Sequence, residues 1–173
     1  PPSQYLQSVI EYAMQSLADS YRSHPRTKQA YVQAQKDCFA IHRQTFGRKG
    51  DAFLFKLAQA HGHLGGLCQI ARDHEQYGDP RTFSLKPLLQ NMDLEDVGTG
   101  MRIDVYVLKW HTERNLLGHV VKYGKVCPGT FGVMVHAEPS LKRLRWMHYV
   151  KQGDYNAAAA NLFEIAVEST ITE

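Results

Sequence analysis

The side chains best suited to bind a metal are one cysteine and three histidines in the first third of the chain. Cys38 and His42 stand four positions apart, which places them on one face of a helix, and His61 and His63 could supply two more ligands. Zinc takes about four such ligands in tetrahedral geometry. The set lacks the paired spacings of known zinc modules. We therefore expect Cys38 to be a small core residue, the histidines to lie at the surface or in turns, and no metal or cofactor to bind.

The other patterns of catalytic residues are incomplete. Gly118 to Lys125 reads GHVVKYGK, one residue too long for a phosphate-binding loop, and Val126 stands where Ser or Thr should hold magnesium. No G-x-S-x-G elbow occurs in the sequence. The acidic group Asp93, Glu95 and Asp96 is typical of a solvated loop. We expect that the chain is not an enzyme.

A small basic group near the C-terminus raises the possibility of nucleic-acid binding. Cations that follow phosphates beside a stacking aromatic ring can bind single strands, and four cations surround Trp146, namely Lys142, Arg143, Arg145 and Lys151. Four cations are few for a strong electrostatic footprint, and the net charge is only +3. We expect Trp146 to be a core residue and the cations to form the solvated face of its helix, so an RNA-binding helical module is the weaker alternative.

Composition indicates a globular chain with a hydrophobic core. Of its 173 residues, 43% are hydrophobic and 21% are charged, which suits one domain of ordinary size or a piece of a longer array. Three widely spaced cysteines do not suggest a disulfide framework and favour the cytosol or nucleus. The chain begins Pro-Pro without methionine. We interpret residues 1–173 as a single helical segment of a longer protein.

Hydrophobic spacing predicts helices along the whole chain. The first stripe contains Leu6, Val9, Ile10, Ala13, Leu17 and Tyr21. Further helices are expected from Pro25 to about Gly47, from Asp51 (as a cap) to the His61–His63 turn, from Leu64 to about Gly78, from Asp79–Pro80 through Leu89, from Leu116 to Gly124 and from Pro128 to Ala137. Residues 91–100 read as a loop. The run 101–110 has strand-forming residues, but its apolar spacing favours a helix.

The stretch from Leu144 to Thr170 predicts two helices folded back on each other. Gly153 can adopt the left-handed conformation that ends the first helix, and Asp154 can cap the second. Four alanines, 157–160, give the second helix a thin face that a neighbour could approach closely. Its apolar face consists of Leu162, Phe163, Ala166 and Val167.

A helix, a tight polar turn and a second helix recur in three places, over residues 53–74, 101–123 and 141–167. One such unit cannot bury its apolar face alone, so neighbouring units must stack. The predicted fold class is therefore all-α, with the architecture of an irregular α-solenoid of stacked helical hairpins.

The same three places resemble a known family. The run AFLFKLAQAHGHLGGLCQIARDHE (52–75) resembles a helix pair of large nuclear pore scaffold proteins. VYVLKWHTERNLLGHVV (105–121) and LRWMHYVKQGDYNAAAANLFEIAVEST (144–170) resemble two later units of those proteins. Their order and approximate spacing are similar to the C-terminal helical part of the nucleoporin 133 family, which stands at the stem end of the Y-shaped coat complex of the nuclear pore.

The resemblance implies a structural role at the nuclear envelope. The family holds a neighbouring Y-complex stem nucleoporin through a compact helical interface and supports nucleocytoplasmic transport of mRNA and protein. It implies no small-molecule substrate and no direct membrane contact for this segment. The last helix lies near that interface by resemblance, with Tyr155, Leu162 and Phe163 as candidate partner-binding residues.

Two alternatives remain open from the sequence. The alanine-rich face of the last helix could pack on the next repeat of the same chain instead of on a partner. The chain could also be a helical-repeat adaptor or a vesicle-coat-type scaffold away from the pore. Regular tandem repeats and a polar concave groove would favour that adaptor.

Overall fold

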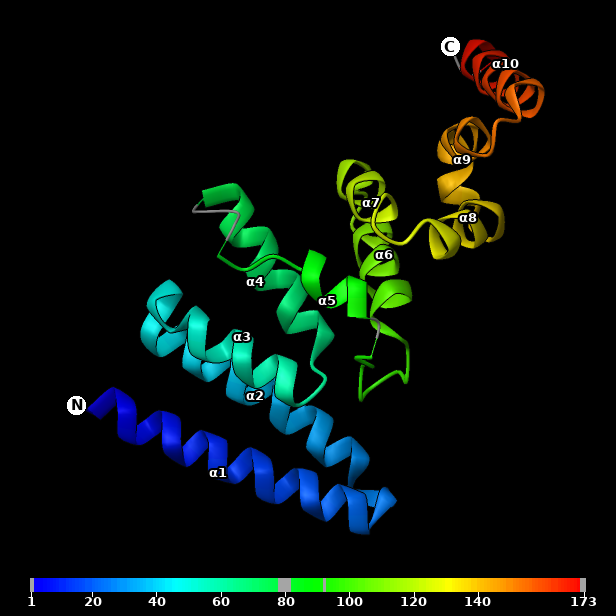
Figure 1. Ribbon diagram of the computed structural model, residues 1–173. Helices are drawn as coiled ribbons and strands as arrows, with labels where there is room; N and C mark the ends of the chain where they lie inside the picture. The colour runs from blue at the N-terminus through cyan, green and yellow to red at the C-terminus, as the bar shows by residue number, and fades with distance from the viewer. Residues whose placement is uncertain (1, 78–81, 92, 172–173) are drawn as a thin grey trace. The chain divides into compact units, whose positions relative to one another are not determined.

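The computed structural model describes residues 2–77, 82–91 and 93–171. Within these ranges the chain is helical, and the one extended pairing is an isolated antiparallel bridge between Glu95 and Arg102. The predicted all-α class is confirmed. The α-helices are α1 (Pro2–Ser23), α2 (Lys28–Phe46), α3 (Asp51–Ala60), α4 (Leu64–Tyr77), α5 (Lys86–Asn91), α6 (Ile103–Glu113), α7 (Leu117–Gly124), α8 (Pro128–Ala137), α9 (Arg145–Gln152) and α10 (Tyr155–Ile171) (Figure 1). Three 3₁₀ turns join them, η1 (Pro25–Thr27), η2 (Gly47–Gly50) and η3 (Pro139–Leu144).

The chain forms two compact units, Pro1–Tyr106 and Val107–Glu173. The division falls within α6, so the segment 1–173 that we expected to be a single unit contains two clusters of contacts.

The expected helix start at Asp79–Pro80 lies outside the described residues. The helix expected around Leu89 is the short α5, in which Leu89 is fully buried.

The first core of unit 1 lies between α1 and α2. Ile10, Met14 and Ala18 of α1 pack against Tyr31 of α2, whose ring stacks on Tyr21 with centroids 5.8 Å apart. The predicted stripe is shifted, because the buried residues repeat every four positions. Met14 is 1% exposed, whereas Val9, which we expected in the stripe, is 46% exposed.

The α3–α4 hairpin turns at His61–His63 as predicted, and a loop closes over it. Gly62 has a φ of +63°, and a Cβ there would lie 2.5 Å from the carbonyl oxygen of Glu95. Val97 N–H donates to the Gly62 carbonyl over 3.1 Å. Asp96 is 7% exposed, and its Oδ2 accepts from Leu64 N–H at the start of α4. The expectation of a purely solvated acidic loop is therefore wrong for Asp96, which satisfies a free amide of the helix start.

The ambiguous run 101–110 is helical from Ile103 onward, as we expected, while Arg102 pairs with Glu95 in the isolated bridge. Ile103, Val107 and Leu108 of α6 are at most 1% exposed. Asp104 is fully buried at the first turn, where Arg102 donates to both of its carboxylate oxygens over 2.7 Å. A carboxylate near a helix N-terminus is favourable, so the sequence-local ion pair supports the start of α6.

The final hairpin of unit 2 has the predicted turn. Gly153 is left-handed with a φ of +78° and ends α9, and Asp154 Oδ1 accepts from Ala157 N–H over 3.0 Å. Trp146, which we expected in the core, is only half-buried. Its backbone N–H donates to Asn161 Oδ1 over 3.0 Å. Asn161 itself is 6% exposed, so a polar side chain takes the buried position between α9 and α10.

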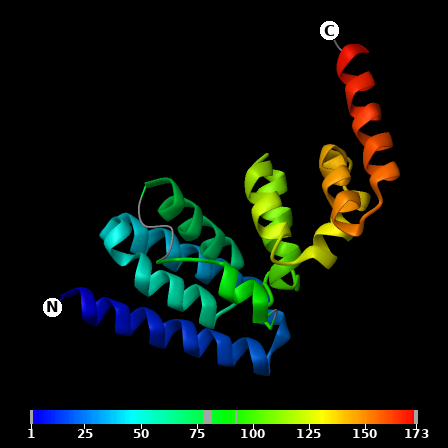
Figure 2. The ribbon, with the colours of Figure 1, turned by 45° about the horizontal axis from the view of Figure 1, so that its top comes forward.

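The two helices of this hairpin differ in length. At 1.5 Å per residue, the 8 residues of α9 span about 12 Å and the 17 residues of α10 about 25 Å. Helix α10 therefore continues past the end of α9 (Figure 2). From residue 162 to 170 every residue of α10 except Ile165 is exposed.

Replacing Gly153 with Ala should destabilise unit 2 by about 1–2 kcal/mol, because a Cβ is unfavourable at a left-handed residue. Gly118→Ala is the matched control, since Gly118 lies in α7, where an added Cβ would meet open space and the backbone geometry is ordinary. That variant should be neutral or stabilising by up to about 1 kcal/mol. Urea unfolding followed by circular dichroism measures both. Equal effects of the two substitutions would contradict the assignment of the turn.

Candidate protein-binding surface and buried polar network

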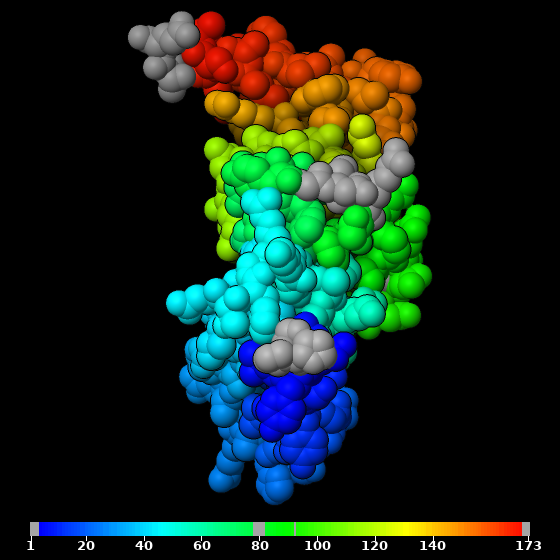
Figure 3. Space-filling model, turned by 90° about the vertical axis from the view of Figure 1, so that its left-hand side faces the viewer, coloured from blue at the N-terminus to red at the C-terminus, as the bar shows by residue number. Residues whose placement is uncertain are grey.

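The three predicted partner-binding residues of α10 are all accessible. Tyr155 is 69% exposed, Leu162 46% and Phe163 72%. Val167, one turn beyond Phe163, is 40% exposed. In Figure 3 the orange-to-red atoms of α10 lie above those of α9 at the top of the view. Large apolar side chains that share one open helical face are typical of a protein contact.

The open face of α10 is uncharged. Tyr155, Ala159, Leu162 and Ala166 recur at positions i, i+4, i+7 and i+11, which is one side of a helix. The two acidic residues beyond Asp154, Glu164 and Glu168, belong to a different side and both pair with Lys142 of η3. An apolar face without charges would be matched best by another apolar surface.

The basic group predicted from the sequence is partly engaged inside unit 2. Lys142 lies 2.9 Å from Glu164 and also binds Glu168. Arg145 donates to the carbonyl oxygens of Val135 and His136 over 2.7 and 3.3 Å. Two of the four cations therefore hold helices together, which weakens the case for a nucleic-acid footprint.

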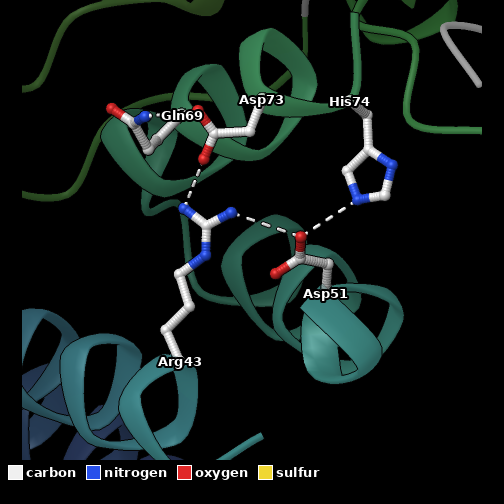
Figure 4. A network of polar contacts seen from close by, with 5 residues as sticks. All are labelled: Arg43, Asp51, Gln69, Asp73 and His74. Atoms are coloured by element: carbon white, nitrogen blue, oxygen red, sulfur yellow. Dashed lines mark hydrogen bonds and ion pairs between the residues drawn. The ribbon is translucent and has the colours of Figure 1, made fainter. Parts of the chain in front are cut away.

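A polar network in unit 1 is the feature that the sequence did not predict (Figure 4). The Oδ2 atom of Asp51 accepts from Arg43 Nη2 over 3.2 Å and from His74 Nε2 over 3.0 Å. Arg43 Nη1 also reaches Asp73 Oδ2 over 2.7 Å, and Gln69 donates to Asp73 Oδ1 over 2.8 Å. One carboxylate thus joins α2, α3 and α4.

Asp51 is not the helix cap that we expected. It is the first residue of α3, Gly50 holds the cap position, and no side-chain hydrogen bond caps the helix start. The Asp51 side chain is fully buried, whereas a cap would be half solvated. The physical reason is its ion pair with Arg43 and its hydrogen bond with His74, since a buried charge is stable only when it is paired and hydrogen-bonded.

His42 lies beside this network in an apolar setting. Its side chain is fully buried, and neither ring nitrogen has a hydrogen-bond partner among the described residues; the same is true of Asp51 Oδ1. Its ring stacks on Phe53 at 4.9 Å, and a Cβ on Gly50 would lie 2.7 Å from its Nδ1. Burial lowers the pKa of His42, and the Asp51 carboxylate opposes that shift. The imidazole is therefore neutral near pH 7.

In the Asp51–His74 pair a carboxylate orients an imidazole, which is an arrangement also found in catalytic sites. A buried carboxylate that fixes an imidazole is half of a nucleophile-activating arrangement. Among the described residues, no hydroxyl or thiol forms a hydrogen bond with His74, whose other neighbour is the ring of Phe83 at 4.3 Å. The Asp51 carboxylate also pairs with Arg43, and Arg43 in turn pairs with Asp73. The arrangement therefore favours a structural role that links the three helices.

The four metal-ligand candidates have separate environments. Cys38 is half-buried, and burial raises the pKa of its thiol. His61 Nδ1 forms a 2.7 Å hydrogen bond with Tyr31 Oη, while the ring of His63 meets the ring of Phe39 edge-on at 5.4 Å. Within ranges 2–77, 82–91 and 93–171, no group of three or more potential ligands is arranged to hold a metal ion.

Comparison with known proteins gives no external guide to function. No protein family, curated protein or solved structure matches the chain. In the described part of the chain, every helix is too short or too polar to cross a bilayer.

Asp51→Asn should destabilise unit 1 by about 3–5 kcal/mol, because it removes the buried charge that the half-buried Arg43 and His74 side chains contact. Asp19→Asn is the control. Asp19 forms an ion pair with Arg22 in which both side chains are more than half exposed, so its loss should cost less than about 1 kcal/mol. Denaturant unfolding gives both values. Similar losses for the two variants would show that the Asp51 network contributes little.

The stability of unit 1 should fall as the pH drops below about 6.5. Burial lowers the pKa values of His42, His61 and His63, so the unfolded chain takes up protons before the folded one does. Stability then rises with pH between the folded values and about 6.5, and is flat above that range. NMR titration should place the three midpoints below about 6.5. Midpoints above that value, or unfolding free energies that rise on acidification from pH 7.5 to 5.5, would contradict this.

Proposed function

We propose that this chain is a structural segment of a nuclear pore scaffold nucleoporin of the nucleoporin 133 type. In this proposal its helical hairpins stack as part of an irregular α-solenoid at the stem end of the Y complex. The segment makes helix-mediated contacts with a neighbouring stem nucleoporin and other scaffold nucleoporins. Through them it supports transport of mRNA and protein at the nuclear envelope.

The observation that carries the proposal is the open face of α10. This face contains exposed aromatic and aliphatic residues and no charge, and it lies in the segment 144–170 whose sequence resembles the family's partner-binding region. Fully burying an exposed side chain of this size contributes about 1.5–3 kcal/mol, and Leu162, at 46% exposed, would contribute less than Phe163, at 72%. A surface of this kind is costly to leave in water and is the natural anchor of a protein contact.

The helical pattern of the three resembling segments also supports the proposal. Residues 52–75 cover most of α3 and α4, residues 105–121 cover most of α6 and the first part of α7, and residues 144–170 cover α9 and nearly all of α10. Helix lengths range from 6 to 22 residues. Such variation favours an irregular scaffold over an adaptor of regular tandem repeats.

The proposal is tested by binding between this chain and the neighbouring stem nucleoporin of the same organism. The double variant Leu162→Glu, Phe163→Glu should lose at least about thirtyfold in affinity, as expected when central anchors are removed. Val133→Glu is the matched control, because Val133 is 71% exposed and belongs to a different helix, α8. It should bind like the wild type. Circular dichroism establishes that each variant is folded.

The other outcomes are equally informative. Binding that survives in the folded double variant would keep the scaffold role and move the contact away from Tyr155, Leu162 and Phe163. Absence of binding by the wild type would favour a helical-repeat adaptor or a vesicle-coat-type scaffold. In that case the α10 face would be the packing surface for another helical repeat.

A further inference from the structure

The contact between α8 and α9 is made by an imidazole lying on a glycine. Gly132 of α8 is buried, and a Cβ there would overlap Cε1 of His148 and lie within 2.8 and 2.9 Å of its two ring nitrogens. All three atoms belong to the imidazole of His148 on α9, so this ring packs directly against the backbone of α8 at Gly132. Only a residue without a side chain leaves room for this approach.

A second imidazole completes the contact. His136, one helical turn after Gly132, meets the ring of His148 edge-on with centroids 5.4 Å apart. The ring of Tyr149 also meets the ring of His136 edge-on, with the two centroids 5.4 Å apart. His136 is exposed and His148 is half-buried. The two histidines therefore share one contact in which water reaches one ring better than the other.

The charged groups around these rings are mainly positive. Burial is the largest cause that lowers the pKa of His148, followed by the His136 ring of α8 and by Lys151 of α9. Arg145 of α9 is anchored on the His136 carbonyl. From η3, Lys142 is turned to α10, where Glu164 and Glu168 bind it, and Arg143 is exposed. Asp154 of α10 caps its own helix. Among the described residues, neither imidazole forms a hydrogen bond or ion pair with a carboxylate.

We propose that the His148–Gly132–His136 contact is an acid-labile joint between α8 and α9. With its ring neutral, His148 packs on Gly132. A proton on His148 would place a positive charge in this half-buried contact, close to Lys151. The joint then loosens as the pH falls.

The sign of this effect follows from the lowered pKa of His148. The opened form binds the proton more readily than the packed form, so acidification below about 6.5 populates the opened form. An 8-residue helix such as α9 is too short to be stable alone. Loosening would therefore appear as faster exchange of its backbone amides, and it would reach α10, which packs on α9.

Hydrogen exchange of the whole chain at pH 7.5 and 5.5 tests the joint. After correction for the intrinsic pH dependence of exchange, wild-type α9 amides should lose at least about threefold in protection at pH 5.5. His148→Phe keeps an aromatic ring beside Gly132 but cannot take up a proton. In this variant the loss of α9 protection at pH 5.5 should be less than half of the wild-type loss. His24→Gln, at an exposed position in unit 1, controls for removal of a histidine and should respond like the wild type.

A direct titration keeps the proposal falsifiable if His148→Phe does not fold. In the wild-type chain, NMR should show the His148 ring titrating below about 6.5, with the amide signals of α9 shifting at the same midpoint. A His148 midpoint at or above about 6.5 would overturn the joint. An α9 that is equally protected at both pH values, or a folded His148→Phe variant with the full wild-type response, would do so as well.

Discussion

The arrangement of α2, α3 and α4 depends on the buried carboxylate of Asp51. It accepts from Arg43 on α2 and His74 on α4 while it stands at the first residue of α3. A charge in this position is stable only with both partners in place, so the network specifies which helices meet and at what register. The neutral His42 packs on the same region between Phe46 and Phe53. Unit 1 is thus fixed by directional contacts as well as by apolar burial.

The last helix of unit 2, α10, is held by contacts on one side only. Its inner side is held by Asn161 and by the Lys142 ion pairs, whereas its outer side is apolar and is largely exposed at Tyr155 and Phe163. A helix in an array buries one face on its own neighbour and offers the other to whatever comes next. The proposed scaffold role rests on this asymmetry, because a hairpin with an open apolar face offers a surface for a protein contact.

Local signals are enough to predict most helices, while buried polar positions could not be predicted. Gly153 and Asp154 end one helix and begin the next by contacts within a few residues, and residues 128–137 form α8 as expected. The predictions of a cap at Asp51 and of a solvated loop at Asp96 are wrong. Their partners, His74 and Leu64, lie 23 and 32 positions away, and nothing in the local sequence reports such pairings. For α10 the apolar positions are evident from spacing, but their exposure depends on the shortness of α9.

The most direct measurement of the scaffold account is hydrogen exchange of the chain with and without the neighbouring stem nucleoporin at saturating concentration. The account predicts that protection increases in α10, at the amides around Leu162 and Phe163, and spreads to α9. It predicts little change in α1 to α4, which have their own core. Protection confined to α1–α4, or no protection anywhere in the presence of that partner, would contradict the claim that the open face of α10 is the contact surface.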